Sequence, residues 1–175
     1  MKRKQKTLSR DEKLTQRCEV LAEVVLALRR VYQGEKDVSD TQKHLLQTII
    51  GAAIWYLPAC DGLFSGWISA NALEEWKKNG KRVATLTKEH RYPRKHAGAD
   101  LLKAKGSELS GKEILDRYKR RWGRYNFVTK KENRSLVPFQ RKSMSAKRCY
   151  RAANIVLEKA PAELINRLGR KRNPQ

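Results

Sequence analysis

The chain has 175 residues, and its 40 Lys and Arg against 18 Asp and Glu give a formal net charge of +22. Its hydrophobic content of 39 % excludes a wholly disordered chain, because disordered chains lack the apolar surface that offsets conformational entropy. No apolar run approaches the roughly 20 residues that span a bilayer and no signal-peptide segment follows Met1, so we expect a cytoplasmic, intracellular protein with no membrane partner.

Two helices are predicted near the N-terminus. Residues 1–10 are polar and basic, which is typical of a flexible arm. Apolar residues then recur at intervals of three and four positions over residues 11–32, which is the spacing of one helix face. Ser39 and Gln42 form a capping box at the start of a second, more apolar helix, which Pro58 ends. Most of the aliphatic residues lie in these helices, so we expect them to be structural.

The next segments change in character. Residues 59–67 are turn-like and aromatic, and a short helix is predicted over 69–78, so that residues 11–80 form a helical scaffold. Two strands are expected beyond it, at residues 83–86 and 125–128, because both are rich in β-branched or aromatic side chains.

A ββα region is predicted over residues 81–140. Ser110 and Glu113 form a capping box that opens a helix between the two strands, which makes this helix an insertion. Thr129 and Glu132 form another capping box immediately after the second strand, so a helix follows that strand directly.

Two further helices, over 146–159 and 161–168, are predicted within a C-terminal region at 141–168. A basic tail occupies residues 169–175. The expected fold class is therefore α+β: a single helix-dominated domain with a small two-stranded ββα-like element and basic, flexible termini.

Four polar residues follow a particular order in the ββα region. Glu89 directly precedes His90 after the first predicted strand, Asn126 lies in the second strand, and Asn133 lies near the first turn of the following helix. This order resembles the HNH nuclease family, whose site is a ββα element. The resemblance covers residues 83–140 and implies an endonuclease that hydrolyses phosphodiester bonds.

The resemblance also implies roles for these residues. His90 would be the general base that activates water, and Asn126 would orient the histidine. Glu89 and Asn133 would hold one divalent cation, Mg²⁺ or another. Such a cation neutralises the charge that develops on the phosphate, and the ordinary pKa of histidine suits a base at neutral pH. Arg94 would supply positive charge beside the scissile phosphate.

A metal-independent, toxin-like ribonuclease is an alternative. In RNA the attacking hydroxyl is already present, so histidine, arginine and lysine can suffice. His90 and His96 would then share the roles of base and acid, with Arg94 and Tyr92 beside them. In that case no metal cofactor is expected, and in neither case do we expect a small-molecule cofactor.

The positive charge itself predicts nucleic acid, DNA or RNA, as the partner. Residues 117–151 include thirteen basic residues and one acidic residue, so the arginines there have too few acidic neighbours to be internal salt-bridge partners. A non-enzymatic RNA- or DNA-binding protein, such as a ribosome-associated or packaging factor, fits this composition equally well. The candidate nucleic-acid-binding residues are Arg91, Lys95, Arg117, Arg120, Arg121, Arg124, Lys130, Lys131, Arg134, Arg141, Lys142, Lys147 and Arg148.

Overall fold

The computed structural model describes residues 8–34, 38–104, 109–142 and 144–169. The predicted arm and tail therefore lie almost wholly outside the described residues. Within the described residues the fold is α+β and dominated by helices, as predicted.

The chain divides into two compact units, each made of two segments. The first unit comprises residues 1–60 and 94–123, and the second comprises residues 61–93 and 124–175. The helix predicted between the two strands therefore belongs to the first unit, whereas the strands themselves belong to the second.

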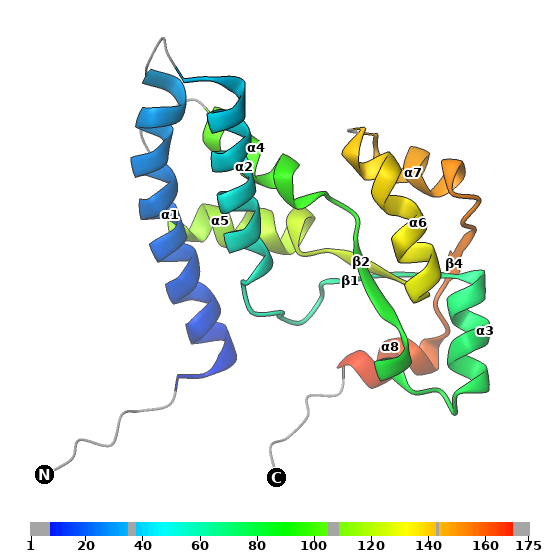
Figure 1. The fold of residues 1–175 in the computed structure, drawn as a ribbon. Helices are drawn as coiled ribbons and strands as arrows, with labels where there is room; N and C mark the ends of the chain where they lie inside the picture. The colour runs from blue at the N-terminus through cyan, green and yellow to red at the C-terminus, as the bar shows by residue number, and fades with distance from the viewer. Residues whose placement is uncertain (1–7, 35–37, 105–108, 143, 170–175) are drawn as a thin grey trace, which may run out of the picture. The chain divides into compact units, whose positions relative to one another are not determined.

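The first unit is helical. It contains α1 (Arg10–Gly34), α2 (Asp40–Trp55), α4 (Arg94–Lys103), α5 (Gly111–Arg117) and a π-helical turn, η2 (Tyr118–Trp122). α1 and α2 lie side by side and run in opposite directions (Figure 1). Both pack against α4, and α1 also packs against α5. Among the helices of the described residues, none has an apolar stretch long enough to cross a membrane.

The predicted apolar stripe is the buried face of α1. Leu14, Cys18 and Val25 on this face are at most 2 % exposed. Arg29 continues the face, and its Nε donates to the backbone oxygen of Leu101 over 2.8 Å. Because the last carbonyls of a helix lack an intrahelical donor, this hydrogen bond satisfies the end of α4 and ties it to α1.

α2 and α4 approach each other closely at two glycines. A Cβ atom at Gly51 would lie 2.5 Å from the backbone oxygen of Arg94, and one at Gly98 would lie 2.2 Å from the backbone oxygen of Gln47. Both distances are shorter than Cβ contacts in proteins, so only glycine permits this packing.

The second unit is built on a mixed four-stranded sheet in the order β2-β3-β1-β4. The strands are β1 (Phe64–Ser69), β2 (Thr87–His90), β3 (Tyr125–Val128) and β4 (Leu157–Lys159). β3 is parallel to β1 and antiparallel to β2, and β4 is antiparallel to β1. The expected strand pair is therefore part of a larger sheet.

The described residues of the second unit also form four α-helices: α3 (Ala70–Lys78), α6 (Lys130–Arg141), α7 (Ala146–Ala152) and α8 (Ala162–Gly169). α6 follows β3 directly, as predicted, and opens with the capping box of Thr129 and Glu132. α6 and α7 lie next to each other (Figure 1). They share one core cluster with β3, formed by Val128, Leu136, Cys149, Tyr150 and Ile155. These two helices therefore cover the sheet face that carries Val128.

The first strand of the ββα element begins directly after the residues predicted to form it. Residues 83–86 do not form a strand: they contain a short 3₁₀ helix, η1 (Val83–Thr85), and β2 starts at Thr87. Thr85 Oγ1 donates to the backbone oxygen of Arg82 over 2.8 Å, which holds the segment as a turn. The β-branched residues of this segment suggested a strand, but strand formation depends on pairing with a partner strand more than on intrinsic preference.

The other two strands were also missed. Residues 59–67 were predicted as a turn, but β1 begins at Phe64. Residues 146–159 were predicted as one helix, but α7 ends at Ala152 and Asn154 has a φ of +53°. A left-handed residue cannot continue a right-handed helix, so the chain turns there and returns as β4 alongside β1.

Candidate functional site

The side chains of β2 and β3 point alternately to the two faces of the sheet. Glu89 pairs directly with Asn126, and His90 pairs with Tyr125. Glu89 and Asn126 therefore share one face, and His90 and Tyr125 share the other. Asn126 is two positions from Val128, so the face with Glu89 is the one that α6 and α7 cover.

Five side chains on this face form a buried polar cluster. Asn126 Nδ2 donates to the Tyr150 hydroxyl oxygen over 2.7 Å, and Ser65 Oγ donates to Asn126 Oδ1. The Tyr150 hydroxyl donates to one carboxylate oxygen of Glu89, and Gln140 Nε2 donates to the other over 2.9 Å. Strands β1, β2 and β3 and helices α6 and α7 each contribute one member, so the cluster joins the sheet to both helices.

The cluster perturbs the acidity of its two titratable members. Glu89 is 4 % exposed, and burial raises its pKa to about 7, although hydrogen bonds from Tyr150 and Gln140 and the charge of Arg91 lower it. Burial, together with the negative charge of Glu89, raises the pKa of Tyr150. A general acid or base needs a pKa near neutral pH, as Glu89 has here. Carboxyl groups with such shifted pKa values occur preferentially at functional sites.

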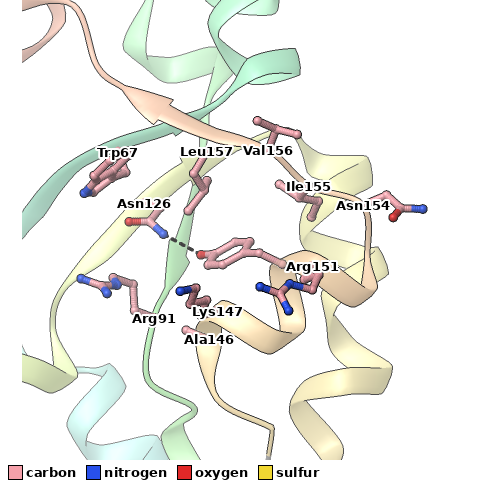
Figure 2. A pocket seen from close by; sticks show the side chains of 11 residues that line it. Trp67, Arg91, Asn126, Ala146, Lys147, Arg151, Asn154, Ile155, Val156 and Leu157 are labelled. Carbon is pink, nitrogen blue, oxygen red and sulfur yellow. Dashed lines mark hydrogen bonds between the residues drawn. The ribbon is translucent and has the colours of Figure 1, made fainter.

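A pocket of about 790 Å³ opens beside the buried polar cluster. Arg91, Lys147 and Arg151 lie along one side of it, while Trp67 and Leu157 lie along the opposite side (Figure 2). Asn126 lies between them and reaches the Tyr150 hydroxyl. The pocket therefore has a cationic side, an apolar side and a polar floor that belongs to the cluster.

His90 is placed differently from Glu89. Its ring lies 6.1 Å from the ring of Tyr125, measured between centroids. The structure brings Glu89 and Asn126 together through Tyr150, but it places the imidazole on the other face of the sheet. Asn126, which was predicted to orient His90, uses its amide to bind Tyr150 and Ser65 instead.

Asn133 is not placed beside Glu89. Gln140 is the α6 residue that contacts Glu89, and Asn133 lies seven residues earlier, which is about two turns or roughly 10 Å along the helix. Both oxygens of Glu89 already accept hydrogen bonds from protein donors. Across the described residues, no group of three or more His, Cys, Asp and Glu could hold a metal ion. This arrangement does not fit a cation held by Glu89 and Asn133, and we assign no reaction step to a metal.

The residues of the alternative ribonuclease site fall in both units. His90 and Tyr92 belong to the second unit, whereas Arg94 and His96 belong to α4 of the first. The Arg94 guanidinium lies 3.5 Å from the centroid of the Trp55 ring, a cation–π contact within the first unit.

The predicted nucleic-acid-binding residues also divide between the units. In the first unit Lys95 and Arg120 are exposed, but Arg117 forms an ion pair with Glu113 and Arg121 lies 3.4 Å from Asp100. Arg117 and Arg121 therefore have acidic partners, one helical turn away and on α4, but both ion pairs lie at the surface and neither is internal. In the second unit the side chain of Arg141 lies outside the described residues and Arg124 is half-buried; the others, Arg91, Lys130, Lys131, Arg134, Lys142, Lys147 and Arg148, are exposed.

Several residues of the site were not singled out by sequence reasoning. Tyr150, Gln140 and Ser65 complete the buried polar cluster, and Trp67 and Arg151 line the pocket. They come from strands and helices far apart in the sequence, so no local motif connects them. The spacing of Lys147 and Arg151 was the one available signal, because residues four apart lie on the same side of a helix.

Comparisons of the chain with protein-family models, with curated proteins and with solved structures find no match. The function of the protein is therefore inferred from the geometry of its pocket and its buried polar cluster.

Proposed function

We propose that this protein binds nucleic acid and cleaves its phosphodiester backbone, and that β2, β3 and α6 provide the site. One observation carries the proposal. β2 and β3 pair in antiparallel fashion with Glu89 opposite Asn126, and the chain continues from β3 directly into α6. This is the ββα order of parts expected from the sequence, and a cation-lined pocket opens beside it.

The charge of the protein supports a polyanionic substrate. The net charge is +22, and the cations of the pocket, Arg91, Lys147 and Arg151, are exposed. None of the salt bridges formed by described residues involves any of these three. Each phosphate that a lysine or arginine contacts releases counterions, so binding should weaken steeply as salt is added.

In the proposed reaction, His90 accepts the proton of the attacking oxygen at neutral pH. That oxygen forms a bond to phosphorus while the bond between phosphorus and the 5′-oxygen breaks, and the 5′-oxygen takes up a proton from solvent and leaves as a hydroxyl group. In RNA the attacking oxygen is the neighbouring 2′-hydroxyl, whereas in DNA it comes from water. Lys88 lies two positions before His90 on the same sheet face, with its ammonium 4.9 Å from the centroid of the Tyr125 ring, and it would hold the phosphate.

His90→Ala tests this proposal. We expect the variant to cleave end-labelled single-stranded RNA or DNA about 100-fold more slowly than the native protein, because the general base is lost, and to bind the same strands equally well. His44→Ala is the matched control, since His44 is exposed on α2 of the first unit, and it should cleave at the native rate.

Each strand is assayed both with magnesium and with a chelator. Cleavage that persists in the chelator would favour the metal-independent ribonuclease, and cleavage that needs magnesium would favour an HNH-like enzyme. If the native protein cuts neither polymer in either buffer, the proposal of cleavage is wrong.

A non-enzymatic nucleic-acid-binding protein is the second candidate. It is favoured by the position of His90, which shares a sheet face with Tyr125 and not with Glu89 and Asn126. On this view the cation-lined pocket binds a strand without cutting it. Tight, salt-sensitive binding with no cleavage by the native protein would select this candidate.

A further inference from the structure

We infer that the pocket beside the buried polar cluster binds one unpaired nucleotide of a single strand, with its phosphate on the cations and its base against Trp67. The inference rests on the proposed function for the kind of polymer that is bound. It does not depend on whether that polymer is cleaved, so the two can fail separately.

The cationic side is built to hold one phosphate. Lys147 and Arg151 are four residues apart on α7, so they lie on the same side of that helix, and both line the pocket. Arg91 is the residue directly after β2, two positions beyond Glu89, and lines the same side of the pocket. Its backbone N–H donates to the backbone oxygen of Arg124 over 3.1 Å, which extends the pairing of β2 with β3 and fixes its position. Three cations from two elements therefore face one cavity.

The apolar side is built to hold a base. Trp67 directly precedes Ile68, which pairs with Phe127, so the indole points away from the face of Ile68 and towards the face that carries Asn126 and the buried polar cluster. The indole side chain is 39 % exposed, and Leu157 lies beside it in the pocket wall (Figure 2). An aromatic ring at the edge of a cationic groove is the arrangement on which single-stranded nucleic acids stack their bases.

The pocket selects an unpaired nucleotide for a geometric reason. A base inside a duplex has both of its faces covered by neighbouring base pairs, so it cannot stack on a protein side chain that lies inside a pocket. The volume of about 790 Å³ is within the range of small-molecule sites, roughly 300–1,000 Å³, and admits a base with its sugar and phosphate.

Trp67→Ala is the first test. A labelled strand of about twelve nucleotides, made as RNA and as DNA, is titrated by fluorescence anisotropy both alone and annealed to its complement. We expect Trp67→Ala to bind the single strand about tenfold more weakly, because one stacked base is lost, and to bind the duplex as the native protein does. Trp67→Phe keeps an aromatic face and should retain most of the affinity, which separates stacking from a defect in folding.

The second test uses a ligand that can fill only the pocket. A nucleoside monophosphate should displace the labelled single strand from the native protein at lower concentration than inorganic phosphate does, and Trp67→Ala should abolish this difference. Arg151→Gln should weaken displacement by both competitors severalfold, because one phosphate contact is lost. Lys77→Gln removes the same charge from an exposed position on α3 and should displace as the native protein does.

Two results would overturn the inference. One is equal loss of single-strand and duplex binding in Trp67→Ala, which would place Trp67 outside the site. The other is equal displacement of the strand by the nucleoside monophosphate and by inorganic phosphate, which would reduce the pocket to an anion site. A protein that shows the single-strand preference and the Trp67 effect but cuts nothing would contradict the proposed cleavage and leave the pocket assignment standing.

Discussion

Replacing Gly98 by alanine is expected to destabilise the protein by about 3 kcal/mol, although alanine is the better helix former. The added Cβ would lie 2.2 Å from the backbone oxygen of Gln47 and 2.9 Å from the backbone nitrogen of Gly51. Both atoms belong to the backbone of α2, so the contact is relieved only if α2 and α4 move apart. Helix propensity alone would stabilise the variant by about 1 kcal/mol, and the two effects therefore predict opposite signs.

The measurement is the free energy of unfolding in denaturant, followed by the helical signal in circular dichroism. Gly34→Ala is the matched control, because a Cβ at Gly34 has no atom within 4 Å in the surroundings of α1. It should change the stability by no more than about 0.5 kcal/mol. A Gly98→Ala protein as stable as the native one would show that α2 and α4 do not pack as closely as described.

Glu89→Gln is expected to remove about 3 kcal/mol of pH dependence from the stability. The pKa of Glu89 in the folded protein is about 7, against an ordinary value of 4.5. Between these two values the folded protein holds a proton that the unfolded chain has released, so stability falls as the pH rises from 4.5 to about 7. Each unit of difference in pKa corresponds to about 1.4 kcal/mol, and the glutamine side chain, which does not titrate, is free of this loss.

Unfolding free energies at about pH 5 and about pH 8 test this expectation. The native protein should lose stability between them, and Glu89→Gln should lose about 3 kcal/mol less. Tyr150→Phe is the companion variant: the Tyr150 hydroxyl lowers the pKa of Glu89, so its removal should extend the loss of stability to higher pH. Identical pH profiles for the native protein and Glu89→Gln would mean that Glu89 is not the buried carboxyl group described.

Glu89→Gln also tests the proposed cleavage. If Glu89 is only a structural member of the buried polar cluster, Glu89→Gln should bind and cleave nucleic acid at the native rate once its stability is accounted for. If its proton is used in the reaction, the rate should fall and its pH profile should change shape. This comparison separates the role of Glu89 from that of His90, which lies on the other face of the sheet.

Local signals in the sequence determined most of the helices and several of their ends, although the helix predicted over 146–159 ends at Ala152. The capping residues Ser39 and Thr129 open the helices predicted for them, because a capping box satisfies backbone N–H groups within a few residues of itself. The buried stripe from Leu14 to Val25 was also predictable, since the period of a helix fixes which residues share a face. The order of residues along the chain also predicted that Glu89 lies beside the first strand of the ββα element and that Asn126 lies in its second strand.

Only the tertiary structure decided which of these residues meet. Glu89 is joined to Tyr150 and Gln140 and separated from His90, because adjacent residues of a strand point to opposite faces and the pairing of β2 with β3 selects the face of each. Trp67 and Arg151 reach one pocket through the sheet order and the turn at Asn154. Pairing between distant segments depends on the whole chain rather than on neighbouring residues. For that reason the sequence determined most of the helices, the charge and the order of the ββα parts, while the fold determined the site.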